Sequence, residues 1–364
     1  MEEVASALER WFSGASRDLP WRRGRTGYSA LVSELMLQQT QVQRVAPAFV
    51  RFMERFPGVE ALAAAPEQEV LAAWQGLGYY RRARLLHAAA KAVVARHAGR
   101  VPQSADELKA LPGVGRYTAG AIASIVFGAR EPIVDGNVFR VLARLAACPG
   151  SATERRASAW AWRQAERLVQ AAANPGIANE ALMELGATVC TPSAPRCSAC
   201  PLAARCTAHA QGKVGEYPSA KPVAERRTLH WHALVVVTAR GVLLEQRTDG
   251  GLWARMWQTP TLESERALDE LGVRSLCAVW GVATRVAGTF VHTTSHRLVQ
   301  FVVHVPVEAA PSAGAGFARS TWVKLEELPQ YPLANAMWRV LQVAGVPVNP
   351  PPSAAPSRRA ATGS

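Results

Sequence analysis

The chain has 364 residues, with 41 Lys and Arg against 28 Asp and Glu, a formal net charge of +13, and six cysteines. That length suggests two or three domains, and 49% apolar against 19% charged residues favours a folded chain. No apolar run reaches the roughly 18 residues of a membrane span, and the acidic N-terminus lacks the basic and apolar regions of a signal peptide. We therefore expect a cytoplasmic protein, where structural disulfides are rare, so the cysteines need another explanation.

Residues 1–210 repeat apolar side chains at helical spacing between Gly/Pro breaks. Helices are predicted over 28–42, 67–74, 83–96 and 157–173. A polar linker, 211–228, leads to segments rich in β-branched residues. There, strands are predicted over 230–238, 241–247, 282–289 and 298–307, with helices over 263–271 and 332–343. We expect an all-α domain (1–210), a smaller α/β domain (229–345) and a disordered, low-complexity tail (346–364).

Four cysteines are clustered with a C-x6-C-x2-C-x5-C spacing: Cys190, Cys197, Cys200 and Cys206. Four thiolates so close together can surround one metal centre, although zinc sites more often pair two C-x2-C knuckles. This loop, 190–206, resembles that of the endonuclease III superfamily of DNA glycosylases, and the resemblance implies one [4Fe-4S] cluster. Cys148 and Cys277 stand in apolar surroundings and are predicted to be small core residues.

A glycine turn precedes a predicted helix in the string LPGVGRYTAG, residues 111–120. Backbone N–H groups around Gly113 and Gly115 can converge on an anion, which the helix N-terminus also favours. The surrounding segment, about 108–125, resembles a helix–hairpin–helix element, which holds a DNA phosphate without reading bases. The positive net charge agrees with a DNA partner.

Tyr117 stands directly after Gly115 and Arg116 in this turn. Superfamily members that also cleave the DNA strand have a lysine there, which forms a Schiff base with the opened sugar. Tyrosine cannot form one. The resemblance therefore implies base removal by water alone, without lyase activity.

Two carboxylates are candidates for the chemistry. Base removal needs an acid for the leaving base and a negative group beside the sugar cation. Asp135, in VDGNVFRVLAR, has the local pattern of a helix N-cap, but the string also resembles the superfamily's catalytic-aspartate segment. On a helix, Glu34, Gln38 and Gln41 would form one polar strip, with Tyr28, Leu31, Val32 and Leu35 toward the core.

The string SELMLQQTQV resembles the signature of the MutY family of adenine DNA glycosylases. That resemblance implies that Glu34 protonates N7 of adenine and later assists the attacking water. Asp135 would then stabilise the cationic intermediate, and Tyr117 would assist near the sugar. Asn137, in the Asp135 segment, is expected to contact DNA.

Other motifs match the same family, and their roles are likewise implied by the resemblance. Arg22 in LPWR and Glu180 in NEALMELG would contact the flipped adenine. Leu77 and Tyr79 in WQGLGYYRRAR resemble the family's wedge residues, although without the match Tyr79 would be interpreted as core. Gln39 and Thr40 would probe the vacated stack and the opposing base.

The C-terminal region, 230–345, resembles the family's Nudix-like domain, which recognises 8-oxoguanine opposite the adenine. The glutamates of a Nudix Mg²⁺ box are lost from GGLWARMWQTPTLESERALDELGV, so pyrophosphatase activity is not expected. The family's H-x-F-S-H loop corresponds to VHTTSHR, with His292, Ser295 and His296 present and Thr294 in place of the Phe.

Together these features predict a monofunctional adenine DNA glycosylase of base excision repair. Its expected partner is double-stranded DNA containing A·8-oxoguanine or A·G mispairs, and the protein is expected to be a bacterial, nucleoid-associated monomer. Two other interpretations remain open. One is an endonuclease III-like pyrimidine glycosylase/lyase, and the other is a non-catalytic iron–sulfur DNA-binding or redox-sensing protein.

Overall fold

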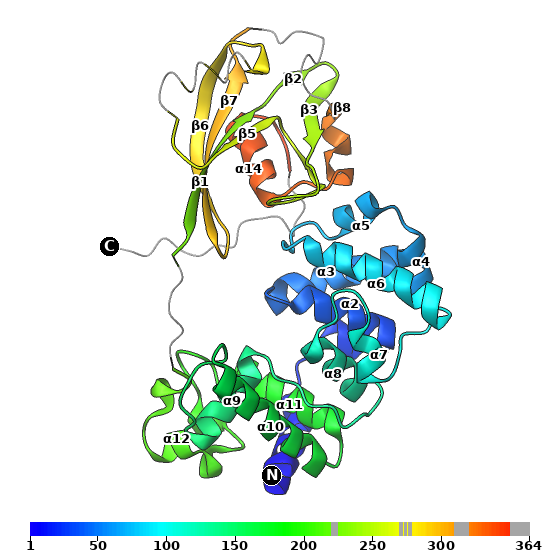
Figure 1. The fold of residues 1–364 in the computed structure, drawn as a ribbon, viewed down its shortest axis with the longest axis vertical. Coiled ribbons are helices and arrows are strands. Elements are labelled where there is room, and N and C mark those ends of the chain that lie inside the picture. Colours follow the sequence, from blue (N-terminus) through cyan, green and yellow to red (C-terminus); the bar gives the residue numbers. More distant parts are fainter. Residues whose placement is uncertain (220–224, 269–271, 273–274, 276–278, 309–319, 350–364) are drawn as a thin grey trace. The chain divides into compact units, whose positions relative to one another are not determined.

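The computed structural model describes residues 1–219, 225–268, 272, 275, 279–308 and 320–349 (Figure 1). The chain divides into two compact units. The N-terminal unit contains Met1–Ala64 and Leu85–Val223, and the C-terminal unit contains Ala65–Arg84 and Ala224–Ser364. Residues 65–84 therefore group with the C-terminal unit, which differs from the continuous 1–210 domain expected from the sequence.

The regular secondary structure among the described residues of the N-terminal unit is helical. Its longer helices are α1 (Glu2–Ala15), α2 (Gly27–Leu37), α3 (Val42–Arg55), α4 (Val59–Ala64), α6 (Arg81–His97, whose first turn belongs to the C-terminal unit), α7 (Ala105–Lys109), α8 (Arg116–Ile125), α9 (Gly136–Ala146), α10 (Arg155–Ala171), α11 (Pro175–Thr188) and α12 (Thr207–Ala210). Short 3₁₀ turns are η1 (Pro20–Arg22), η2 (Cys197–Ala199), η3 (Ala203–Arg205) and η4 (Val214–Glu216). None of the described helices is both long and apolar enough to traverse a bilayer.

One apolar core is shared by α1, α9, α10 and α11, with Leu8, Phe139, Leu168 and Leu182 almost fully buried in it. Side-chain caps fix where two of these helices start. The Asp135 carboxylate accepts from the N–H of Val138 at the start of α9, and Asn174 caps α11 in the same way. Both helices therefore begin at a capped residue, and they pack against each other through the shared core.

The C-terminal unit is built on two small sheets. Its strands are β1 (Arg227–Leu234), β2 (Val237–Thr238), β3 (Gly241–Gln246), β4 (Trp257–Gln258), β5 (Thr261–Ser264), β6 (Thr284–Thr293), β7 (Arg297–Pro306) and β8 (Ser320–Val323). The first sheet has the order β5-β1-β7-β6, with β1 and β7 parallel, and β8 joins β3 in the second. The 3₁₀ turn η5 (Leu325–Gln330) and helices α14 (Asn335–Val343) and α5 (Glu67–Ala73) complete the unit.

The predicted fold class, a helical domain followed by a smaller α/β domain, is confirmed. The predicted helices at 67–74, 83–96, 157–173 and 332–343 and the four predicted strands correspond to observed elements within a few residues. The predicted helix at 263–271 is wrong at its start, where β5 pairs with β1; residues 269–271, Cys277 and 350–364 lie outside the described residues.

Two further predictions need correction. The helix predicted over 28–42 ends at Leu37, because Gln38 leaves the helical region and Gln39 has φ +55°. Gln38 and Gln41 therefore do not continue a helical strip from Glu34. Cys148 is only partly buried, because it follows Ala147, whose left-handed conformation ends α9 and turns the chain away from the core.

Candidate active site

A cavity of about 650 Å³ in the N-terminal unit gathers residues from five separate segments. Eight residues proposed from the sequence line it: Arg22, Glu34, Gln39, Thr40, Tyr117, Asp135, Asn137 and Glu180. They come from η1, α2 and the loop behind it, α8, the start of α9, and α11. A cavity of this size with convergent polar groups is typical of a small-molecule or nucleobase site.

Glu34 lies on α2, in which Tyr28, Leu31, Val32 and Leu35 are buried as predicted. Burial raises the pKa of Glu34 to about 7, and the charges of Asp135 and Glu180 act in the same direction. A hydrogen bond with Tyr117 and the charge of Arg25 act against this rise. A carboxyl with a pKa near neutrality can serve as a general acid at physiological pH.

Asp135 is both a helix cap and a wall of the cavity. Its Oδ1 accepts from the Val138 N–H at 2.7 Å, and Oδ2 accepts from Asn137 Nδ2 at 3.4 Å. Burial raises the pKa of Asp135, whereas the hydrogen bonds from Val138 and Asn137 act to lower it. The N-cap interpretation and the catalytic interpretation are therefore compatible, because capping fixes the carboxylate that faces the cavity.

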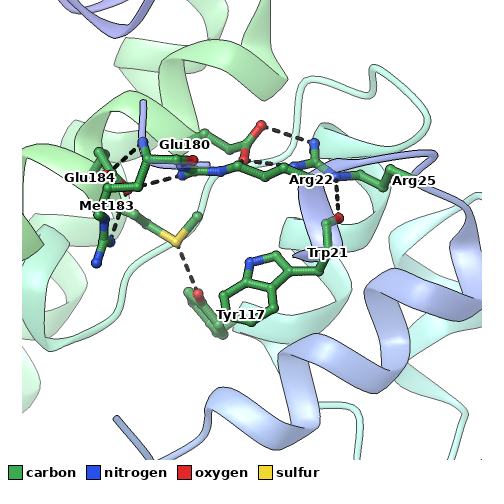
Figure 2. A network of polar contacts seen from close by, with 8 residues as sticks. Trp21, Arg22, Arg25, Tyr117, Glu180, Met183 and Glu184 are labelled. Atoms are coloured by element: carbon green, nitrogen blue, oxygen red, sulfur yellow. Dashed lines mark hydrogen bonds and ion pairs between the residues drawn. The ribbon is translucent and has the colours of Figure 1, made fainter. Parts of the chain in front are cut away.

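Tyr117 lies in the first turn of α8, and its hydroxyl donates to Met183 Sδ at 3.0 Å (Figure 2). Burial and the nearby charges of Glu34 and Asp135 raise the pKa of Tyr117 well above its usual value. The phenol is therefore neutral at physiological pH. Among the described residues, no lysine lines this cavity.

A network of ion pairs forms another wall of the cavity (Figure 2). Glu180 accepts from Arg22 Nε at 3.1 Å and from both terminal nitrogens of Arg25 at 2.8 and 2.9 Å. Glu184 accepts from Arg17 Nε at 2.5 Å and from Arg22 Nη2 at 3.0 Å. Arg22 thus joins the two carboxylates, which stand one helical turn apart on α11.

Burial acts to raise the pKa of Glu184, but its bonds to Arg17 and Arg22 outweigh this and hold the pKa below its usual value. Arg17, Arg25 and Glu184 were missed in the sequence. The available signal was the i, i+4 pair of glutamates in NEALMELG, because acidic side chains on a buried helix need cationic partners.

The loop after α2 presents Gln39 and Thr40. Gln39 is exposed and has φ +55°, a left-handed conformation that is unfavourable for a residue with a side chain. Its neighbour Gln38 reaches Thr118 Oγ1 on α8 at 3.4 Å. The loop is therefore held in a fixed, strained shape at the rim of the cavity.

The predicted hairpin connects α7 and α8, anchored by the buried side chains of Leu108, Leu111 and Val114. Gly113 has φ +79°, and a Cβ there would lie 2.7 Å from Leu85 Cβ, so only glycine fits. Gly115 is exposed and caps the N-terminus of α8. The next residue, Arg116, stacks on the Trp162 ring at 3.8 Å. A backbone turn beside a cation is suited to binding a phosphate.

The four clustered cysteines line one small cavity. Arg144 and His209 also line it. All four have free thiols. Among the described residues, no group of three or more His, Cys, Asp or Glu side chains is arranged to hold a single metal ion. The four cysteines nevertheless line one shared space.

Helix α9 connects this cysteine loop to Asp135. Asn137, which hydrogen-bonds Asp135, accepts from Arg140 Nη2 at 2.8 Å, and Arg140 Nε donates to the Cys190 carbonyl at 2.8 Å. One helical turn further on, Arg144 donates to the carbonyls of Thr191 and Pro192 and to Cys190 Sγ. The loop and the cavity therefore share one continuous set of hydrogen bonds.

In the C-terminal unit, Tyr79 is 43% exposed, whereas Leu77 is only 4% exposed. The Tyr79 hydroxyl hydrogen-bonds Ser295 Oγ in the turn between β6 and β7. Next to Ser295, Thr294 closes that turn through three hydrogen bonds with the backbone of Arg297. His292 packs edge-on against Trp253, and His296 is exposed. The unit thus presents Tyr79 and Ser295 together, while Leu77 is covered.

Comparison with known families assigns both halves of the chain. Residues 32–167 match the HhH-GPD superfamily of base excision DNA repair proteins, and residues 232–343 match the NUDIX domain. In structure, the chain resembles a thermostable thymine-DNA glycosylase, with a TM-score of 0.52 and 28% identity over 57% of this chain and 95% of that one.

Several curated relatives are similar over most of their length, and each is named an adenine DNA glycosylase. The protein of Rattus norvegicus is 35% identical over 92% of this chain and 77% of its own. That of Homo sapiens is 34% identical over 93% and 73%, and that of Mycolicibacterium smegmatis is 40% identical over 74% and 90%.

Proposed function

The chain belongs to the adenine DNA glycosylases of base excision repair, and on that premise we propose that it removes adenine paired with 8-oxoguanine, or with guanine, by hydrolysis and without cutting the strand. The observation that carries the proposed chemistry is the pair of carboxyl groups in one cavity, Glu34 with a pKa near 7 and Asp135 capped on α9. Neither DNA binding nor redox sensing requires such a pair.

The proposed reaction begins with adenine turned out of the helix into the cavity. Protonated Glu34 donates its proton to N7 of adenine, the C1′–N9 bond breaks, and its electron pair leaves with the neutral base. Asp135 stabilises the oxocarbenium ion of the sugar by its negative charge. Water then adds to C1′, and its proton passes to the Glu34 carboxylate, which restores the acid.

The other residues of the cavity are assigned to positioning. Glu180 and Arg22 lie in the ion-pair network and are proposed to contact the adenine. Tyr117 is hydrogen-bonded to Glu34, and its neutral phenol is proposed to lie beside the sugar. Because a Schiff base needs an amine and the described cavity has no lysine, we propose that the enzyme has no lyase activity.

The DNA contacts divide between the units. Gly113 and Gly115 are proposed to bind a backbone phosphate, Asn137 to contact the DNA beside them, and Gln39 and Thr40 to probe the vacated stack and the opposing base. In the C-terminal unit, Tyr79 and Ser295 are proposed to contact the 8-oxoguanine, with His292 and His296 supporting that turn. Leu77 is buried and would have to move to act as a wedge.

We propose that Cys190, Cys197, Cys200 and Cys206 hold a [4Fe-4S] cluster, for which their shared cavity and four free sulfur atoms are suited. When bound, such a cluster can exchange an electron and ties the four ligands together. A cysteine loop fixed in this way would also restrain the start of α9 and Asp135, because Arg140 and Arg144 hydrogen-bond α9 to the loop.

The test uses end-labelled duplexes containing A·8-oxoguanine, A·G or thymine glycol opposite adenine. We expect adenine release from the first two, with strand breaks only after alkali. Breaks without alkali, or a protein–DNA adduct trapped by borohydride, would remove the hydrolytic mechanism. Cleavage of only the thymine-glycol duplex would instead support the pyrimidine glycosylase/lyase. The purified protein should also absorb near 400 nm.

A further inference from the structure

Gln75 is a buried polar residue in the segment 65–84, and its whole carboxamide is bound by the C-terminal part of the same unit. It is 4% exposed. Its Nε2 donates to the carbonyls of Pro329 at 3.2 Å and Tyr331 at 2.7 Å, and its Oε1 accepts from Trp338 Nε1 at 3.3 Å. A carboxamide so buried must be hydrogen-bonded, and each of these bonds crosses about 250 residues of sequence.

The four residues after Gln75 form the turn that leads to Tyr79. Gly76, Gly78 and Tyr79 itself have positive φ, at +85°, +69° and +48°. Trp74 Nε1 donates to the Gly78 carbonyl at 3.2 Å, and Arg82 Nη2 donates to the carbonyls of Leu77 and Gly78. The turn is therefore rigid within itself, and its position depends on what holds its two ends.

The tip of this turn meets Ser295 through the Tyr79 hydroxyl. Ser295 is equally fixed, because Thr294 closes its own turn on Arg297. Two rigid turns that meet at one side-chain contact must both be anchored to the same unit if the two hydroxyls are to stay aligned. On the Tyr79 side, the anchor is Gln75, which is hydrogen-bonded to the η5–α14 segment.

We propose that Gln75 is a positioning residue for recognition of the opposing base: it fixes the Tyr79 turn to the η5–α14 segment, and so holds Tyr79 and Ser295 as one probe. The inference rests on the proposed function, because it assigns to that probe the distinction between 8-oxoguanine and guanine. 8-Oxoguanine differs from guanine by a carbonyl oxygen at C8 and an N–H at N7, so a displaced hydroxyl loses these contacts first.

The same segment offers a matched control. Gln68, at the start of α5, also binds the C-terminal part of the unit, accepting from Trp257 Nε1 at 3.1 Å and donating to the Arg255 carbonyl at 3.4 Å. It lies two helical turns before the Tyr79 turn and is exposed where it meets Arg255. Its loss should loosen the segment without displacing the probe.

The experiment compares full-length wild type with Gln75→Met, Gln68→Met and Trp338→Phe. Methionine keeps the length and volume of glutamine but forms none of its hydrogen bonds. Equilibrium binding is measured on uncleavable duplexes with a 2′-fluoro adenosine opposite 8-oxoguanine or guanine, and unfolding is followed in urea. For Gln75→Met we expect about fivefold loss in the ratio of the two affinities, as these three hydrogen bonds are removed.

Trp338→Phe should lower the same ratio by about twofold, because of the three hydrogen bonds of Gln75 it removes one, that donated by the indole N–H. Gln68→Met should leave the ratio unchanged. Equal weakening on both duplexes in Gln75→Met, or an unchanged ratio, would overturn the positioning role, since a purely structural residue affects both alike. If Gln75→Met does not fold, the Trp338→Phe ratio decides. Wild type without preference for 8-oxoguanine would defeat the proposed function itself, and this inference with it.

Discussion

The two sites proposed for this molecule, the cavity of Glu34 and Asp135 and the Tyr79–Ser295 probe, differ in charge and in exposure to solvent. The cavity of Glu34 and Asp135 is charged and shielded, with carboxylates whose pKa values burial has raised and arginines that neutralise its wall. The Tyr79–Ser295 probe is uncharged, and Tyr79 is exposed. Chemistry on a leaving base needs a proton held in low dielectric, whereas recognition needs groups that reach a base still inside the helix.

The largest effect is expected from the centre of the charged part. Glu34→Gln keeps the size of the side chain but removes the transferable proton, so adenine excision should fall by at least about 10³-fold. Single-turnover excision on A·8-oxoguanine duplexes measures it, and binding to the uncleavable duplex should stay within about twofold. Retention of more than a tenth of the wild-type rate would falsify the assignment of the acid.

The next effect is on stability. Glu184→Ala leaves Arg17 and Arg22 without one of their carboxylate partners beside the cavity, so the free energy of unfolding should fall by about 3 kcal/mol. Urea denaturation measures it. The control is Arg23→Ala, which breaks a pair with Asp18 that is exposed on both sides and should change stability little. Equal effects of the two variants would mean that the network is no stronger than a surface pair.

pH separates the two parts of the molecule. Because the acid must be protonated and the pKa of Glu34 is about 7, the rate of the chemical step should be near its maximum below pH 6 and fall about tenfold per unit above pH 8. Single-turnover rates from pH 5 to 9 measure this. Affinity for the mispair does not depend on the Glu34 proton transfer and should change much less. A rate that rises with pH across this range would argue for Glu34 acting first as a base.

A smaller effect is expected from the Tyr79–Ser295 probe, on the ratio of two affinities. Ser295→Ala removes one hydroxyl that hydrogen-bonds Tyr79, and we expect about tenfold weaker binding of A·8-oxoguanine with little change for A·G. Competition binding measures the ratio. The matched control is Ser264→Ala, a half-buried serine at the end of β5 in the same unit, for which the ratio should be that of wild type. A tenfold loss on both duplexes would place Ser295 among the general DNA contacts.

The sequence predicted the fold class and most elements because local spacing carries that information. It also singled out Glu34, Tyr117 and Asp135, which the fold brings to one cavity, although their roles stay predictions. It failed at Gln38–Gln41, where polar residues continue a helical spacing but Gln39 turns into a left-handed conformation. Apolar and polar periodicity cannot detect such a break, since it is set by the contacts of the following loop.

Long-range pairing was also beyond the sequence. Arg17, Arg25 and Glu184 have the appearance of ordinary surface charges until α11 is placed beside η1. Residues 65–84 have a helical pattern like that of their neighbours, and contacts such as those of Gln75, Gln68 and Tyr79 reveal their membership of the C-terminal unit. A hydrogen bond between residues 256 positions apart leaves no local pattern.

That separation in sequence has a consequence for synthesis. Gln75 leaves the ribosome long before Tyr331, and at roughly 5–20 residues per second the delay is on the order of 10–50 s. All helices that line the cavity of Glu34 and Asp135 are complete by Thr188, so they can pack while the Tyr79 turn still lacks the η5–α14 segment that holds it. A chain whose synthesis stops before the C-terminal strands would therefore have Glu34 and Asp135 in place but would lack the partners of Gln75 and Tyr79 that we propose for recognition of the opposing base.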